Sequence, residues 1–138
     1  MDAHNAHQIR TDPDPMEPYR LAQGYRVGNL IFLSGQAAID AHGAIVGAGD
    51  FAAQAEQVFA NLAQVLKAAG SDLDKVIKVT IYLTDMARFP DIVDLRGRYF
   101  SPPYPADTIV EVKALALPEL MIEIEAVALV EGARVAAG

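Results

Sequence analysis

Residues 121–130 read MIEIEAVALV and residues 76–83 read VIKVTIYL, and these two stretches decide the fold. Both alternate as strands do, because successive side chains of a strand point to opposite faces of its sheet. One face of the first stretch is fully apolar: Ile122, Ile124, Ala126 and Ala128. Its other face is mixed: Glu123, Glu125, Val127 and Leu129. A second sheet face that is partly apolar needs cover from another subunit, so we expect an oligomer.

A helix is predicted over residues 51–69, where apolar residues recur in steps of three and four. Asp50 is placed to cap its N-terminus, and Gly70 stands where a C-terminal glycine belongs. Polar residues, among them Gln54 and Asn61, are expected on the solvent side of this helix.

The remaining elements complete the order β, β, α, β, α, β, β. Strands are expected at residues 26–33 and 108–114, and a shorter helix from about residue 90 to residue 100. This order in a short chain predicts an α/β (α+β) fold, with one mixed β-sheet and two helices packed on one face.

The composition fits one globular domain. The chain has 138 residues, of which 52% are hydrophobic and 21% charged. We expect the domain to span residues 19–131. Residues 1–18 are polar and rich in proline, so we expect a flexible or loosely docked tail there, and residues 132–138 form a C-terminal tail.

Charge and missing residue types exclude several functions. The net charge of −7 argues against nucleic-acid partners, and the absence of cysteine removes disulfides and thiolate catalysis. No apolar run approaches the roughly 20 residues of a membrane span, and the N-terminus lacks a signal-peptide core, so a cytoplasmic protein is expected. No metal-ligand spacing such as HExxH occurs, so no metal site is expected.

Glu123 is the most interesting carboxylate, because its strand face becomes apolar beyond Glu125. Partial burial there would raise its pKa, which suits a general acid or base acting through water. The alternative is a solvated side chain, or one paired with Lys113 or Lys78.

Gly35 ends a strand, where the lack of a side chain lets a ligand approach the backbone N–H. A β-bulge is the alternative interpretation. We favour a strand-end hydrogen bond over a nucleophilic role for Ser34, because no histidine is expected to reach it. Asp107 read alone is a loop-end residue, and Arg96 is either solvated or turned toward an interface cleft.

Four segments together resemble the RidA/YjgF family of reactive-intermediate deaminases, over roughly residues 19–130. They are VGNLIFLSGQ at 27–36, DKVIKVTIYLTDM at 74–86, PADTIVEV at 105–112 and IEIEAVA at 122–128. The resemblance implies a chorismate-mutase-like fold and a homotrimer with substrate clefts between subunits. It also implies hydrolysis of enamines and imines to keto acids and ammonia, without a cofactor.

The family's site residues carry over position by position. The water-positioning glutamate falls on Glu123, the strand-end glycine on Gly35 and its neighbour on Ser34. The substrate-site tyrosine falls on Tyr19, through Glu17-Pro18-Tyr19.

Two further positions depart from the family. The arginine that binds the substrate carboxylate falls on Asp107, and a position that is often Cys or Thr falls on Ile109. A carboxylate at position 107 would repel a substrate carboxylate. Three alternatives are open: Arg96 or another arginine restores the contact, the substrate is neutral or cationic, or the site only binds a ligand.

The sequence therefore predicts hydrolytic deamination of a reactive imine, enamine or related small molecule with altered specificity. The alternative is a non-catalytic trimer that binds a small molecule. Ribonuclease activity is attached to some relatives of the family, but the net charge of −7 argues against it here.

Overall fold

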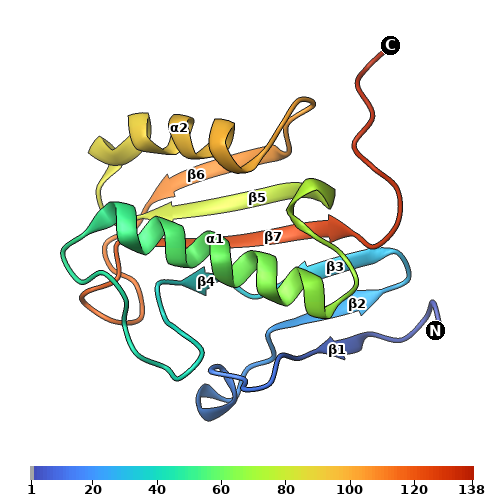
Figure 1. Ribbon diagram of the computed structural model, residues 1–138, viewed down its shortest axis with the longest axis horizontal. Helices are drawn as coiled ribbons and strands as arrows, with labels where there is room; N and C mark the ends of the chain where they lie inside the picture. Colours follow the sequence, from blue (N-terminus) through green and yellow to red (C-terminus); the bar gives the residue numbers. More distant parts are fainter. Residues whose placement is uncertain (1) are drawn as a thin grey trace.

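A computed structural model describes residues 2–138 and shows one mixed sheet with both helices on the same face (Figure 1). The strands are β1 (His7–Ile9), β2 (Gly24–Val27), β3 (Leu30–Leu33), β4 (Gln36–Ala37), β5 (Val76–Leu83), β6 (Ala106–Glu111) and β7 (Ile122–Leu129). The helices are α1 (Phe51–Ala68) and α2 (Phe89–Tyr99), with 3₁₀ turns η1 (Glu17–Tyr19), η2 (Leu73–Lys75) and η3 (Met86–Arg88). This confirms the predicted architecture of one mixed sheet and two helices. The prediction of one strand at residues 26–33 is wrong, because Gly28, with a φ of 58°, turns the chain and the segment forms the hairpin of β2 and β3.

The strand order is β1-β2-β3-β7-β5-β6, with β4 also pairing with β7. β5 and β6 run parallel, and the connection between them carries α2 back over the sheet. The other strand pairs of the described chain are antiparallel. β7 therefore lies in the middle of the sheet, where its two faces meet different surroundings.

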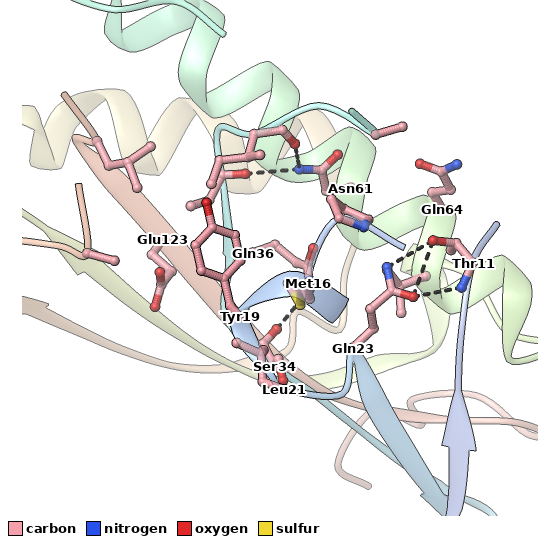
Figure 2. Close-up of a pocket in the computed structure, with 18 of the residues that line it drawn as sticks. Thr11, Met16, Tyr19, Leu21, Gln23, Ser34, Gln36, Asn61, Gln64 and Glu123 are labelled. Atoms are coloured by element: carbon pink, nitrogen blue, oxygen red, sulfur yellow. Dashed lines mark hydrogen bonds between the residues drawn. The ribbon is translucent and has the colours of Figure 1, made fainter. Parts of the chain in front are cut away.

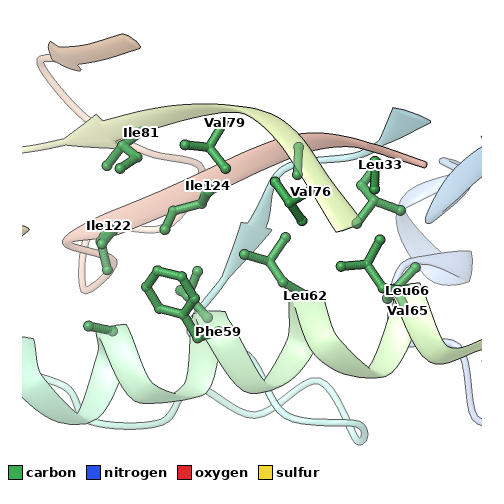
Figure 3. Packing of buried hydrophobic residues seen from close by; sticks show 14 of the residues in the cluster. Leu33, Phe59, Leu62, Val65, Leu66, Val76, Val79, Ile81, Ile122 and Ile124 are labelled. Carbon is green, nitrogen blue, oxygen red and sulfur yellow. The ribbon is translucent and has the colours of Figure 1, made fainter. Parts of the chain in front are cut away.

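The core lies between α1 and the sheet (Figure 3). Leu62 and Leu66 of α1 are fully buried against the apolar faces of β5 and β7. The predicted helix ends are confirmed: Asp50 accepts a hydrogen bond from the Ala53 N–H at 3.1 Å, and Gly70 has a φ of 79°. No helix in the described part of the chain is both long and apolar enough to cross a membrane.

The prediction that Gln54 and Asn61 face solvent is wrong. Gln54 is fully buried, and its amide joins the loop before α1 to the loop before β7 through three hydrogen bonds to the backbone. Asn61 donates to the carbonyls of Ala37 and Ile39, at 2.9 and 2.7 Å. Buried loop carbonyls need such donors, and amide side chains supply them where the helical period alone predicts solvent.

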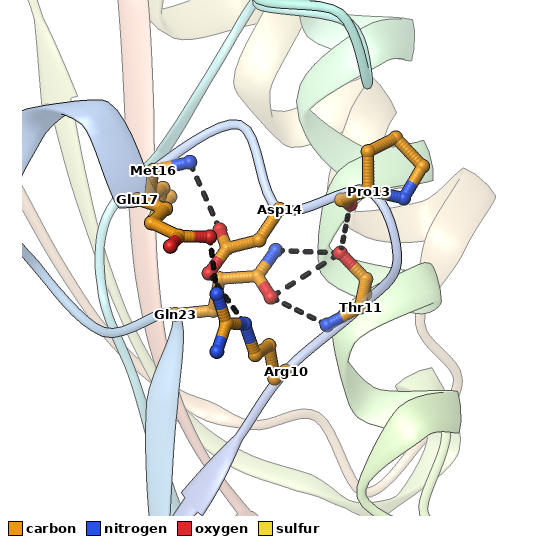
Figure 4. Close-up of polar contacts among 7 residues, drawn as sticks. All are labelled: Arg10, Thr11, Pro13, Asp14, Met16, Glu17 and Gln23. Atoms are coloured by element: carbon orange, nitrogen blue, oxygen red, sulfur yellow. Dashed lines mark hydrogen bonds and ion pairs between the residues drawn. The ribbon is translucent and has the colours of Figure 1, made fainter.

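The expected N-terminal tail is largely ordered, although Met1 lies outside the described residues. β1 pairs with β2, with His7 opposite Arg26. Residues 10–23, which we call the strap, form the loop that joins β1 to β2 and contains η1 (Figure 4). Cross-strand hydrogen bonds and rigid prolines offset the entropy that a polar segment would otherwise keep, and so order it.

Two polar contacts hold the strap. The Arg10 guanidinium forms ion pairs with Glu17 and with the buried carboxylate of Asp14. The Thr11 N–H donates to Gln23 Oε1 at 2.7 Å, and Gln23 Nε2 donates to Thr11 Oγ1 at 2.9 Å. Both ends of the strap are thus tied to each other (Figure 4).

Residues 132–138 contain no helix or strand. Arg134 nevertheless donates to the carbonyls of Asp74 at 2.8 Å, Val76 at 2.6 Å and Ser101 at 3.1 Å. The first part of this tail is therefore held against the loops at one end of β5.

Candidate functional site

A cavity of about 540 Å³ lies between the strap and α1, and we call it the strap cavity (Figure 2). Its size falls within the roughly 300–1,000 Å³ of small-molecule pockets. The strap forms one wall and α1 another, while the end of β3, β4 and β7 close the cavity. Residues from each part that matter here are Met16, Tyr19, Gln23, Ser34, Gly35, Asn61, Val65 and Glu123.

Glu123 lies directly against Gly35. β4 pairs with β7 in a register that places Ala37 opposite Glu123. This pairing brings Gly35, which directly precedes β4, close to the Glu123 carboxylate. A Cβ atom on Gly35 would fall 2.5 Å from Glu123 Oε2 and 2.8 Å from Glu123 Cδ. The φ of Gly35 is not in the left-handed region, so the space it leaves, rather than its conformational freedom, is what the site uses.

The Glu123 carboxylate is unpartnered within residues 2–138, where no protein group donates a hydrogen bond to it. Lys78, an expected alternative partner, donates instead to Thr108 Oγ1 at 2.7 Å and to the Val79 carbonyl. Burial raises the pKa of Glu123, and the nearby charge of Glu125 raises it further. A carboxyl group of this kind holds a proton closer to neutral pH and can exchange it with water.

Ser34 and Tyr19 also line the strap cavity. The Ser34 hydroxyl donates to the Ala22 carbonyl at 2.6 Å, which is the strand-end hydrogen bond that we favoured for it. Tyr19 belongs to η1, and its side chain is exposed at the cavity mouth. Four of the predicted site residues therefore meet at one place: Tyr19, Ser34, Gly35 and Glu123 (Figure 2).

Arg96 and Asp107 form an ion pair at a second pocket. Arg96 Nε donates to Asp107 Oδ2 at 2.9 Å, and Arg96 Nη2 donates to Asp107 Oδ1 at 2.9 Å. This bidentate geometry is the strongest form of an arginine–carboxylate contact. Both residues line a separate pocket with Tyr104, whereas Ile109 is half-buried and packs on the core. Asp107 is thus a neutralised charge and not a free one.

Within one chain the Asp107 and Glu123 side chains point to opposite faces of the sheet. Asp107 is aligned with Val79 of β5, whose side chain is buried under the helices. Glu123 is aligned with Tyr82, three positions further along β5 and therefore on the other face. Asp107 and Glu123 can act on one substrate only if the two groups come from different subunits.

Apart from Tyr19, the strap residues and Asn61 were not predicted to form part of the cavity walls. A signal was present: Pro13, Pro15 and Pro18 restrict the backbone to extended and turn conformations, which favours a rigid connection over a flexible tail. The helical period could not place Asn61, because its role depends on a loop carbonyl distant in the sequence.

Comparisons with known proteins show the family of the chain. Residues 9–130 match the family model described as Endoribonuclease L-PSP. The chain is 43% identical over 115 residues to the RutC family protein y4sK of Sinorhizobium fredii, covering 83% of this chain and 89% of that protein. It is 33% identical over 119 residues to a Dermatophagoides farinae protein named 2-iminobutanoate/2-iminopropanoate deaminase, covering 86% and 91%.

A solved structure gives the same result for the fold. The crystal structure of RidA from the Antarctic bacterium Psychrobacter superposes with a TM-score of 0.81 at 35% identity, covering 89% of this chain and 98% of that one. The sequence match spans almost the whole sheet and both helices. The chain therefore belongs to the Endoribonuclease L-PSP family, which includes the RutC and RidA/YjgF proteins.

Proposed function

We propose that this protein hydrolyses the carbon–nitrogen bond of a reactive imine or enamine and releases ammonia without a cofactor. The observation that carries the proposal is the unpartnered Glu123 carboxylate, which stands against Gly35 at a small-molecule cavity. The relative from Dermatophagoides farinae is named as a deaminase, which supports the same class of reaction.

The reaction needs one water molecule and one group that moves a proton. An enamine first gains a proton from water at carbon and loses one from nitrogen to water, which gives the imine. Glu123 accepts a proton from water as the water oxygen attacks the imine carbon, and the C=N electron pair moves to nitrogen. Glu123 then returns that proton to the nitrogen, which gives a carbinolamine. The Glu123 carboxylate next takes the carbinolamine hydroxyl proton and passes it to the nitrogen, so the C–N bond breaks, the carbonyl forms and ammonia leaves. The raised pKa of Glu123 suits both transfers.

Gly35 contributes space and a backbone N–H. Because Gly35 has no side chain of its own, Glu123 lies against it, and a substrate heteroatom bound beside Glu123 can approach the Gly35 peptide N–H. Tyr19 stands at the cavity mouth, where it can cover the bound substrate.

The Arg96–Asp107 pair underlies the altered specificity in this proposal. Its two charges cancel, so a substrate carboxylate would meet only the guanidinium N–H groups that Asp107 leaves free. A neutral substrate would be tolerated equally well. The pair therefore favours substrates that do not depend on a full carboxylate–arginine contact.

A homotrimer with the substrate in an inter-subunit cleft is part of the proposal. The sheet face opposite the helices exposes Tyr25, Leu30 and Phe32, and Phe32 is aligned with Val127 of β7. Such a patch is typical of a subunit interface. Burying it would also allow the Arg96–Asp107 pair of one subunit to approach the Glu123 of another.

The test is release of ammonia and keto acid from freshly generated imines and enamines. We expect turnover by the wild type and its loss in Glu123→Gln, with the trimer intact by light scattering. Glu131→Gln is the control, because that exposed side chain lies just beyond β7. Full activity of Glu123→Gln would contradict the role of Glu123.

Asp107→Arg separates the substrate classes. If only this variant hydrolyses 2-imino acids, the scaffold is competent and the natural substrate lacks that carboxylate. Binding of small molecules by calorimetry without turnover in either protein would instead support a binding trimer, which the neutralised Asp107 also permits.

A further inference from the structure

Several polar side chains around the strap cavity are hydrogen-bonded to one another or to the backbone. Asn61 donates to two loop carbonyls, and its amide oxygen accepts from Gln57 at 2.8 Å. Gln23 is bonded to Thr11, and the Ser34 hydroxyl to a backbone carbonyl. Glu123 differs from them, because it has no such partner among residues 2–138.

Most of the remaining cavity wall is apolar. It is formed by proline, aliphatic and methionine side chains of the strap, of α1 and of the loop before β7: Pro13, Pro15, Met16, Leu21, Val65 and Leu117. Water in such a space finds few partners, so its release into bulk solvent favours an apolar ligand group. The strap cavity thus has an unpartnered carboxylate at Glu123, beside Gly35, and a body that is mostly apolar, although Gln64 and the bonded amides of Gln23 and Asn61 also line it.

The strap holds the wall of the strap cavity in place before any ligand binds. The ion pairs of Arg10 with Asp14 and Glu17, and the Thr11–Gln23 hydrogen bonds, fix the wall (Figure 4). A fixed wall gives a fixed volume, and a fixed volume selects ligands by length and shape.

We propose that the strap cavity binds the apolar substituent of the substrate, with the reacting carbon at Glu123 and Gly35. The substrate class is an imine or enamine that carries a branched-aliphatic or aromatic group, and not one with only a methyl substituent. This inference rests on the proposed function, because it assigns the side-chain pocket of the same site.

Straight-chain carboxamides, from acetamide to hexanamide, test ligand binding in the strap cavity separately from catalysis, because they are not hydrolysed as imines are. Titrated into the full-length protein by NMR, they should bind about fourfold more tightly for each added methylene until the cavity is full. Ala116→Leu should cancel most of this gain, since Ala116 is an exposed loop residue that lines the cavity. Ala114→Leu is the matched control, being exposed in the same loop but outside the lining.

Met16→Ala gives the opposite perturbation. It widens the strap cavity from the strap side and should move the tightest binding toward longer amides. An affinity that does not change with chain length, or an equal loss in Ala116→Leu and Ala114→Leu, would overturn the proposed binding in the strap cavity.

The imine assay keeps the two proposals apart. If the amides bind as expected but no imine is hydrolysed, binding in the strap cavity stands and the hydrolase proposal fails. If imines with methyl and benzyl substituents are hydrolysed at equal kcat/KM and the amides bind with equal affinity, the hydrolase stands and binding in the strap cavity is refuted.

Discussion

Gly35→Ala is the sharpest perturbation that the structure offers, because it adds a single methyl group against Glu123. That methyl carbon would lie 2.5 Å from Oε2, 2.8 Å from Cδ and 3.0 Å from Cγ of Glu123. Ordinary contacts of a Cβ atom begin near 3.4 Å, so the carboxylate must retreat by about 0.9 Å.

This displacement of the Glu123 carboxylate should lower the free energy of unfolding only slightly, but it should lower the activity strongly. The glutamate side chain is flexible, and leaving its preferred rotamer costs about 0.5–1.5 kcal/mol. A misplacement of about 1 Å in a catalytic group lowers the rate by about 100-fold. We therefore expect kcat to fall about 100-fold in Gly35→Ala, while the free energy of unfolding falls by about 1 kcal/mol.

The assay is ammonia release under saturating imine, together with urea unfolding of the same preparations. Glu123→Asp in the Gly35→Ala background shortens the side chain and should remove the stability cost, which a double-mutant cycle measures. The reasoning is refuted if Gly35→Ala keeps wild-type kcat, or if its stability cost is the same with aspartate at position 123.

Four further predictions concern single residues. Glu123 has a folded-state pKa above its ordinary value of 4.5, so its contribution to stability is present below that value and is lost as the pH rises through the folded pKa. The glutamine of Glu123→Gln cannot ionise, so the Tm of this variant should match that of the wild type near pH 4 and exceed it near pH 8. An equal difference in Tm between variant and wild type at both pH values would contradict this. Asp107→Asn breaks the half-buried bidentate pair with Arg96 and should lower the free energy of unfolding by about 1 kcal/mol in urea titrations. Leu62→Ala, at a fully buried position, should cost about 2–5 kcal/mol in the same measurement, and a cost below 1 kcal/mol would show a core that collapses around the gap. Gly97→Ala adds a Cβ with nothing within 4 Å and should stabilise α2 by up to about 1 kcal/mol, which calorimetric melting would detect.

Most of the helices and strands can be predicted from the pattern of neighbouring residues. The two-residue period of β5 and β7, and the capped three- and four-residue period of α1, are properties of neighbouring residues. The same rules placed Gly35 at a strand end and Glu123 on the second face of β7. They failed for Gln54 and for the N-terminal segment, where hydrogen bonds to distant parts of the chain decide the conformation.

The two helices, the strands that follow α1 and the mixed face of β7 were determined by the sequence alone, because each follows from periodicity and turn chemistry. Tertiary structure decided which residues meet. Glu123 lies against Gly35 because β4 pairs with β7 in one register, and Asp107 meets Arg96 because α2 folds back over β6. The walls of the strap cavity, contributed by segments some 50 residues apart in the sequence such as Thr11 and Asn61, exist only once long-range pairing has closed the fold.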